Sequence, residues 1–235
     1  MHGKMYLTAS MLQKLATALS SSRRIDGMSQ MVEIKSKTEL YADDANIRKK
    51  WRRRTSNEKP EWIVIHYTGD ASVNGDADHA ARSIISSSRD SSTHYLIGDR
   101  YIVNLLPVKY AAYHVGKMDD KKLIPCYNGN AIAVDLCESK ENTSSDSVSC
   151  TDWFFKDSVI DNAVNFVASL AVNYSIPSDK IVRHYDVTHK RCPRPFVGKD
   201  INSHTGKTHD SAWLEFKRRI DEKITEIKSK ATVVR

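Results

Sequence analysis

Long hydrophobic runs are absent from this chain of 235 residues. No apolar segment approaches the roughly 18–20 residues that a membrane-spanning helix needs, so we expect no transmembrane segment. The first twelve residues are interrupted by polar side chains and lack the continuous apolar core of a secretory signal. We therefore expect a chain without a secretory leader, which stays in the cytoplasm until another route releases it.

Cysteine is scarce as well. The four cysteines, Cys126, Cys137, Cys150 and Cys192, are too few for a disulfide scaffold in a chain of this length. No CxxC pair occurs, which argues against a zinc ribbon with four cysteine ligands. Cys126 and Cys150 both fall in predicted loops, and a disulfide between them stays open.

The chain is basic overall, but it also contains many acidic residues. Thirty-six Lys and Arg residues against 29 Asp and Glu give a net charge of +7. Such an excess favours anionic partners, among them nucleic acid, anionic lipid and acidic cell-wall polymers, without choosing between them. The segment Arg48–Arg54 places six of the positive charges around Trp51. We expect a solvated helix face or linker there, with contact to an acidic polymer as the alternative.

The chain divides by pattern into two parts. Residues 1–57 are predicted to form a basic, helical N-terminal extension, with one helix over residues 8–20 and another from about residue 37 to 54. Residues 58–235 show the alternation of strands and helices that is typical of an α/β domain with a central mixed β-sheet packed by helices.

The predicted strands of the second part are short, apolar and rich in β-branched residues. They cover residues 62–66, 94–98, 101–106, 131–137 and 180–184, and the second and third form a hairpin around Asp99-Arg100. Amphipathic helices are predicted over residues 78–88, 158–174 and 211–230. Residues 138–151 are polar and are predicted to form a surface loop.

Three side chains of this domain can be interpreted as zinc ligands. His66 ends an apolar strand, His184 ends another, and Cys192 follows in the next loop. Functional side chains of α/β proteins are commonly placed at such strand ends. Two imidazoles and one thiolate leave the fourth tetrahedral position open for water, as catalytic zinc sites require. Zinc would lower the pKa of that water from about 15.7 towards roughly 7.

Five segments in this order carry a family resemblance: WIVIHYT from Trp62, STHYLIGD from Ser92, AYHVG from Ala112, NAIAVDLC from Asn130 and RHYDVTHKRCP from Arg183. The set closely resembles the zinc-dependent N-acetylmuramoyl-L-alanine amidases of the type-2 amidase family, relatives of phage endolysins, bacterial autolysins and peptidoglycan recognition proteins. The resemblance covers about residues 60–200. It implies cleavage of the amide between N-acetylmuramic acid and L-alanine of bacterial peptidoglycan, with His66, His184 and Cys192 holding Zn²⁺.

The resemblance also implies roles for other residues. Lys190 matches a lysine near the metal that helps to stabilise the oxyanion, and Asp135 matches a glutamate that moves the proton of the attacking water. Aspartate is one methylene shorter than that glutamate, and a structural hydrogen-bond acceptor is the alternative role for Asp135. Thr93 stands where some members have a tyrosine, and we assign it to substrate binding together with His114, for which a surface histidine is the alternative.

Two other histidines are less suited to the metal. His94 is expected to be a partly buried strand residue, and His189 is too close to Cys192 in a tight loop to join the same tripod. Cys137 ends a core strand and is expected to behave as a small apolar side chain.

Two alternatives to catalysis stay open. One is a recognition module that binds peptidoglycan without cutting it; non-cleaving members of the family tend to lose the metal cysteine, which is present here. The other is a binder of nucleic acid or anionic membranes through residues 48–54, although no nucleic-acid partner is expected. The favoured setting is a monomeric phage or prophage endolysin, released by a holin or a secretion machine to act on the cell wall.

Overall fold

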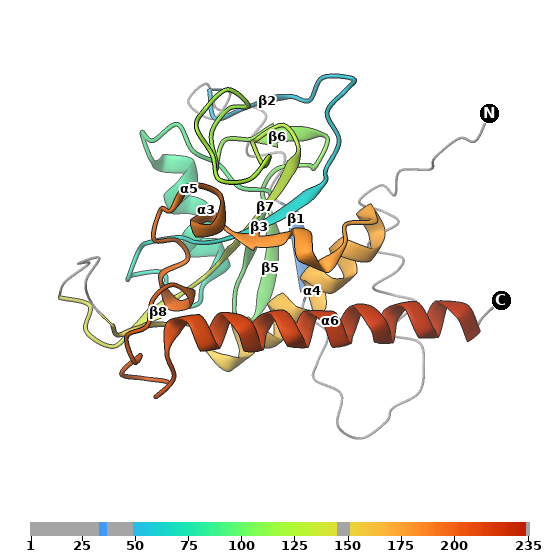
Figure 1. The fold of residues 1–235 in the computed structure, drawn as a ribbon. Coiled ribbons are helices and arrows are strands. Elements are labelled where there is room, and N and C mark those ends of the chain that lie inside the picture. The colour runs from blue at the N-terminus through green and yellow to red at the C-terminus, as the bar shows by residue number, and fades with distance from the viewer. Residues whose placement is uncertain (1–32, 37–48, 145–150, 234–235) are drawn as a thin grey trace.

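A computed structural model describes residues 33–36, 49–144 and 151–233 (Figure 1). The helix predicted over residues 8–20 and the cysteine at position 150 lie outside these ranges. Within them the chain forms one six-stranded sheet and two small two-stranded sheets. No helix in the described ranges has the length and apolar character needed to cross a bilayer.

The six-stranded sheet is mixed, as predicted. Its strands in spatial order are β1 (Glu33–Ser36), β5 (Tyr101–Asn104), β4 (Tyr95–Ile97), β7 (Ala131–Leu136), β3 (Trp62–Tyr67) and β10 (Ile181–Arg183). The hairpin pair β4 and β5 is antiparallel, and the other neighbours are parallel. The small sheets pair β2 (Trp51–Arg53) with β6 (Tyr110–Ala112) and β8 (Ser139–Lys140) with β9 (Trp153–Phe154).

The predicted helices are confirmed as α3 (Ala77–Ser86), α4 (Asp157–Tyr174) and α6 (His209–Val233). A short helix, α5 (His184–Thr188), occupies part of what the sequence suggested was a loop. Two 3₁₀ turns, η1 (Ser178–Lys180) and η2 (Arg194–Phe196), flank it along the chain. Figure 1 shows α4 and α6 crossing on the same side of the sheet.

One face of the sheet carries the main core. Side chains alternate between the two faces along a strand, so Ile63 and Ile65 of β3 point to one side and Val64 and His66 to the other. Ile63 and Ile65 are fully buried in a cluster with apolar side chains of α4 and α6, including Val167 and Phe216. This face is therefore filled with apolar side chains.

The opposite face is divided between a second core and polar side chains. Alanines of α3 pack with Leu96 and Val103 and cover the β4–β5 part of this face. His66 and Asp135 lie on the neighbouring β3–β7 part, where they are register partners in parallel strands. The chemistry-bearing side chains of these two strands therefore point away from α4 and α6.

Strands replace helix in the described residues before position 58. The predicted helix through residue 54 is wrong for Trp51–Arg53, which form β2 and pair with β6. Further upstream, β1 adds a parallel edge strand beside β5. These pairings join residues on the N-terminal side of position 57 to the sheets on its other side, while the division into 1–57 and 58–235 stays a prediction.

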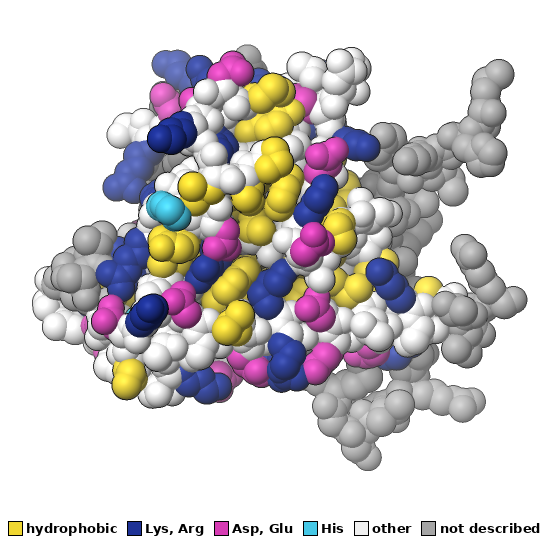
Figure 2. Space-filling model, viewed as in Figure 1, with side chains coloured by type: hydrophobic (Ala, Val, Ile, Leu, Met, Phe, Trp, Pro, Cys, Tyr) yellow, Lys and Arg dark blue, Asp and Glu magenta, His cyan; other side chains and the backbone are white. Residues whose placement is uncertain are grey.

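The basic segment around Trp51 is held by the protein itself. Arg52 forms a bidentate ion pair with Glu58, with both N···O distances 2.6 Å, and this pair lowers the pKa of Glu58 to about 2. The Trp51 ring lies against Tyr110, with 4.3 Å between ring centroids. The prediction of a solvated helix face is therefore wrong for these residues. On the face shown in Figure 2, Lys and Arg side chains are interspersed with Asp and Glu.

The polar segment after β7 is also not a simple surface loop. Glu138, Ser139 and Lys140 are buried, and the last two form β8. Lys140 donates a 2.9 Å hydrogen bond to Asp152, so its charge is paired where it is buried. Polar composition predicted exposure here, but charged residues can be buried when hydrogen bonds compensate for the lost water.

Arg54 provides a test of how the N-terminal segment is attached. Its guanidinium donates to the carbonyl oxygens of Val108 at 2.9 Å, Ala131 at 2.7 Å and Gly129. We expect Arg54→Leu to lower the free energy of unfolding by about 2–4 kcal/mol, because these carbonyls lose a charged donor. The exposed neighbour Arg53 is the matched control, and Arg53→Leu should change stability by about 0.5 kcal/mol or less. Urea unfolding measures both, and equal effects would contradict this role.

Candidate metal centre

The three predicted zinc ligands meet at the C-terminal end of the parallel strands. His66 comes from β3, His184 is the first residue of α5 directly after β10, and Cys192 lies in the following loop. One ligand atom from each residue lies within 4.8 Å of the others. All three side chains are buried, with exposed fractions of 5, 6 and 3%. The spacing that suggested a tripod in the sequence therefore corresponds to a real cluster.

The local chain path explains how Cys192 reaches the two histidines. Helix α5 ends at Thr188, and the next residue, His189, has a left-handed φ of 62° that turns the chain back. The backbone N–H of Tyr185 then donates to the carbonyl oxygen of Cys192 at 2.9 Å. This bond fixes the cysteine beside the start of the helix that carries His184.

One distance in the cluster has the value that zinc coordination requires. Sγ of Cys192 lies 3.6 Å from Nδ1 of His66. Zn–S and Zn–N bonds of about 2.3 and 2.0–2.1 Å at a tetrahedral angle place sulfur and nitrogen about 3.6 Å apart. The separation of these two atoms therefore fits two ligands on one zinc ion.

The hydrogen-bonding state of His184 also fits a ligand. Its Nδ1 is buried and has no hydrogen-bond partner among the described residues. Buried polar atoms in native proteins are nearly always satisfied, so this nitrogen is available to bind a ligand. The donor set of two nitrogens and one sulfur matches the chemistry that zinc prefers.

Burial sets the protonation of the cluster in the absence of metal. It lowers the pKa of His66 well below 6.5 and that of His184 to about 4, helped in both cases by the charge of Lys190. Neutral imidazole is the form that binds metal. Burial raises the pKa of Cys192 to about 12, against the opposing effects of a hydrogen bond from the Tyr67 backbone and the charge of Lys190. A divalent cation would therefore release a proton on binding.

Asp135 lies next to this cluster. Its strand β7 pairs with β3 so that Asp135 and His66 are register partners. Burial raises the pKa of Asp135 to about 7, while a hydrogen bond from Thr93 lowers it, Glu138 raises it and Lys190 lowers it. A carboxyl group that titrates near neutral pH is suited to both accepting and releasing a proton.

Thr93 and Lys190 differ in their exposure to solvent. Thr93 is 1% exposed, and its hydroxyl donates to the carbonyl oxygen of Tyr95 at 3.3 Å. It therefore already has partners inside the protein, and its assignment to substrate binding stays a prediction. Lys190 is exposed, yet its charge affects the pKa of His66, His184 and Asp135. An exposed cation thus lies within electrostatic reach of the cluster.

Three other histidines of the sequence analysis lie in different surroundings. Nδ1 of His114 lies 3.0 Å from Nε2 of His66, so His114 belongs to the cluster's surroundings. His94 was predicted to be partly buried in a strand; it directly precedes β4 and is fully buried. Its ring nitrogens bond to the carbonyl oxygen of Tyr110 and the backbone N–H of Ala133. His189 is exposed at the end of α5 and is not one of the three clustered ligands.

Glu138 is the polar residue that the sequence did not single out. It is fully buried and accepts hydrogen bonds from the backbone N–H and hydroxyl of Thr68, at 2.9 and 2.7 Å, and from the N–H of Asp70 at 2.8 Å. These bonds fix the turn that directly follows His66-Tyr67. The position of Glu138 directly after an apolar strand could have indicated a buried residue. The polar residues that follow it led instead to the prediction of a surface loop.

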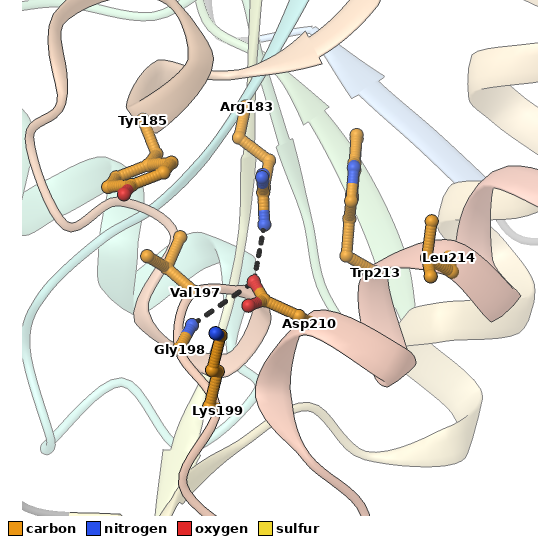
Figure 3. A pocket seen from close by; sticks show the side chains of 8 residues that line it. All are labelled: Arg183, Tyr185, Val197, Gly198, Lys199, Asp210, Trp213 and Leu214. Carbon is orange, nitrogen blue, oxygen red and sulfur yellow. Dashed lines mark hydrogen bonds and ion pairs between the residues drawn. The ribbon is translucent and has the colours of Figure 1, made fainter.

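A cleft of about 340 Å³ opens elsewhere, where β10 ends against α6 (Figure 3). It contains none of the predicted site residues. Its central Arg183 donates to the carbonyl oxygen of Phe196 and to the carboxylates of Asp186 and Asp210. Figure 3 shows Asp210 held between Arg183 and the backbone of Gly198. The polar groups of the cleft thus largely bond to one another.

The raised pKa of Asp135 predicts how stability depends on pH. Between its ordinary value of 3.8 and about 7 the folded chain keeps a proton that the unfolded chain has lost, so stability falls as pH rises through this window. We expect metal-free Asp135→Asn to be more stable than the unmodified chain by roughly 1–3 kcal/mol at pH 8, with the difference vanishing near pH 4. A difference that stays constant with pH in urea unfolding would contradict the shift.

Comparison with known proteins places the chain in a family. Residues 56–195 match the family described as N-acetylmuramoyl-L-alanine amidase. Among curated relatives, the N-acetylmuramoyl-L-alanine amidase CwlL of Bacillus licheniformis is 33% identical over 144 residues, which cover 57% of this chain and 36% of the relative. The amidase BlyA of Bacillus subtilis (strain 168) is 24% identical over 174 residues, covering 69% and 41%. The chain thus spans well under half the length of these relatives.

Solved structures share the fold. A mutant endolysin from Bacillus subtilis aligns with a TM-score of 0.56 and 24% identity over 81% of this chain and 99% of that one. PlyL aligns with a TM-score of 0.56 and 19% identity over 82% and 97%. At these identities the likeness supports the fold, while the family match covers more than half of the residues. This chain is therefore a member of the N-acetylmuramoyl-L-alanine amidase family.

Proposed function

We propose that the chain is a zinc-dependent hydrolase that cuts the amide between the lactyl group of N-acetylmuramic acid and L-alanine in bacterial peptidoglycan. The observation that carries the proposal is the convergence of His66, His184 and Cys192 beside Asp135, in a chain of the amidase family. The names of the curated relatives support the same activity.

His66, His184 and Cys192 would hold the zinc ion. Bound zinc would polarise the scissile carbonyl and make water a nucleophile near neutral pH. Three protein ligands leave room for the reacting groups, whereas a fourth protein ligand would close the site. The low exposure of these ligands keeps competing bulk water away from the cation.

Asp135 would act first as a general base and then as a general acid. As a carboxylate it accepts a proton from the attacking water, and as a carboxylic acid it returns that proton to the amine of L-alanine when the C–N bond breaks. The products are then a lactyl carboxylate and a free amino terminus. Burial raises the pKa of Asp135 to about 7 in the metal-free chain, which makes this carboxyl group a stronger base than an exposed aspartate.

Lys190 would stabilise the negative charge that develops on the carbonyl oxygen. Its charge already affects the pKa of His66, His184 and Cys192, so it lies within electrostatic reach of the cluster. A donor of this kind typically contributes a few kcal/mol to the transition state. Its exposure allows the side chain to move toward the substrate.

Substrate contacts and setting extend the proposal. His114 Nε2 is buried without a partner among the described residues, which supports a polar contact to the muramyl peptide, and Thr93 supports the site through Asp135. A phage or prophage endolysin is the setting that we favour, supported by the shared fold with an endolysin from Bacillus subtilis.

A peptidoglycan recognition module is the alternative function. It would need a surface that binds peptidoglycan but neither the metal nor the proton carrier. The presence of Cys192 in the cluster and the position of Asp135 beside His66 favour catalysis over recognition alone.

Zinc content and activity test the metal site. The purified chain should bind one zinc ion, and Cys192→Ser should weaken binding by roughly a hundredfold or more and abolish clearing of cell walls. Cys126→Ser is the matched control, because Cys126 is also a buried free thiol but lies outside the cluster. Elemental analysis and competition with a chromogenic chelator provide the readout. Lysis that survives both a chelator and Cys192→Ser would overturn the zinc mechanism.

Mass spectrometry of digested peptidoglycan tests which bond is cut. We expect glycan strands with free lactyl carboxylates together with peptides that carry new L-alanine amino termini. Cleavage between sugars or within the peptide would refute the proposed activity. Binding without any cleavage would favour the recognition module.

Asp135→Asn tests the proton carrier. An amide cannot accept the proton of the attacking water, so kcat/KM should fall by roughly 10²–10⁴-fold while zinc binding is retained. In the unmodified chain, kcat/KM should decline at acid pH as Asp135 becomes protonated. Burial raises the pKa of Asp135 to about 7 in the metal-free chain and the charge of bound zinc lowers it, so this acid limb should lie below about pH 7. A variant that keeps this acid limb and most of the rate would assign the proton transfer to another group.

A further inference from the structure

The two nitrogens of the His66 ring face different partners. Nδ1 lies 3.6 Å from Sγ of Cys192, and Nε2 lies 3.0 Å from Nδ1 of His114. The rings of His66 and His114 meet edge to face, with 5.1 Å between centroids and 80° between planes. The ring therefore connects the ligand cluster on one side to a second imidazole on the other.

Hydrogen-bond chemistry restricts what this contact can be. Two ring nitrogens 3.0 Å apart share one proton, because two N–H groups would repel and two lone pairs would not attract. If Nδ1 of His66 is to bind a metal through its lone pair, the ring proton must sit on Nε2. Nε2–H then donates to Nδ1 of His114, which accepts.

His114 is held in place for this task by its backbone. The N–H groups of His114 and Val115 both donate to Oδ1 of Asn128 at 2.9 Å. Asn128 is 6% exposed, and its own N–H donates to the carbonyl oxygen of Gly116 at 2.9 Å. The segment that follows β6 is thus fixed before any substrate arrives.

We propose that His114 is a positioning residue, which accepts a hydrogen bond from Nε2–H of His66 at its own Nδ1 and so fixes the orientation and tautomer of His66 with Nδ1 directed to the metal. This inference rests on the proposed zinc site. Metal-binding histidines usually donate their second N–H to a carboxylate, a carbonyl or water, and loss of that partner typically weakens metal binding 10–100-fold. Here a neutral imidazole takes that place.

The arrangement separates two roles of His114 by atom. Nδ1 faces His66, whereas Nε2 is buried and has no partner among the described residues. A contact to substrate would use Nε2, and positioning of His66 uses Nδ1. Variants that preserve one nitrogen position at a time can therefore distinguish the two roles.

The test compares His114→Asn with His114→Gln. The side-chain oxygen of asparagine can occupy the place of Nδ1, whereas the amide of glutamine reaches the place of Nε2. We expect zinc affinity, measured by chelator competition at pH 7.5, to stay within about threefold for His114→Asn and to fall 10–100-fold for His114→Gln. His204→Gln, at an exposed histidine that pairs with Glu141 and is not one of the three clustered residues, is the control and should not change affinity.

A spectroscopic readout needs no variant. Long-range ¹H–¹⁵N NMR of the metal-free protein reports which nitrogen of His66 carries the proton, and we expect the Nε2–H tautomer. Equal zinc affinity in both His114 variants and the unmodified chain, or a proton on Nδ1 of His66, would overturn the inference. If the unmodified chain binds no zinc while His66 is Nε2-protonated, the proposed function fails and the histidine pair stands.

Discussion

The site depends on one constraint, the parallel pairing of β10 with β3. Arg183 is the register partner of Ile65, so the next residues, His184 and His66, arrive side by side at the same edge of the sheet. Helix α5 and the left-handed turn at His189 then return Cys192 to them. Because side chains alternate along a strand, a slip of one residue in β3 would turn His66 toward the apolar core under α4 and α6.

Burial determines the protonation states and the unsatisfied hydrogen bonds of the side chains at this edge of the sheet. The same low exposure keeps the imidazoles neutral and raises the pKa of Cys192 and Asp135. It also leaves a nitrogen of His184 without a partner in the part of the chain that the structure describes. Neutral imidazoles are ready to bind a cation, whereas the Cys192 thiol must lose its proton when a cation binds. The chain compensates nearby, where Glu138 and Asn128 satisfy the backbone of the adjacent turns.

The sequence was informative where periodicity and local spacing determine structure. The buried strands β3 and β7 and the amphipathic helices α4 and α6 follow from their apolar patterns. The strand ends suggested His66 and His184, and the family resemblance joined them with Cys192 into one ligand set. It was misleading where distant partners decide. Arg54 looks solvated until the carbonyls of β7 and its neighbours are known, and the pairing of His114 with His66 spans two strands that no local pattern connects.

Anomalous X-ray scattering at the zinc absorption edge tests the central claim most directly. Crystals of the zinc-loaded protein should show one strong peak at about 2.0–2.4 Å from a nitrogen of His66, a nitrogen of His184 and Sγ of Cys192. A peak elsewhere, or zinc held without Cys192, would contradict the account.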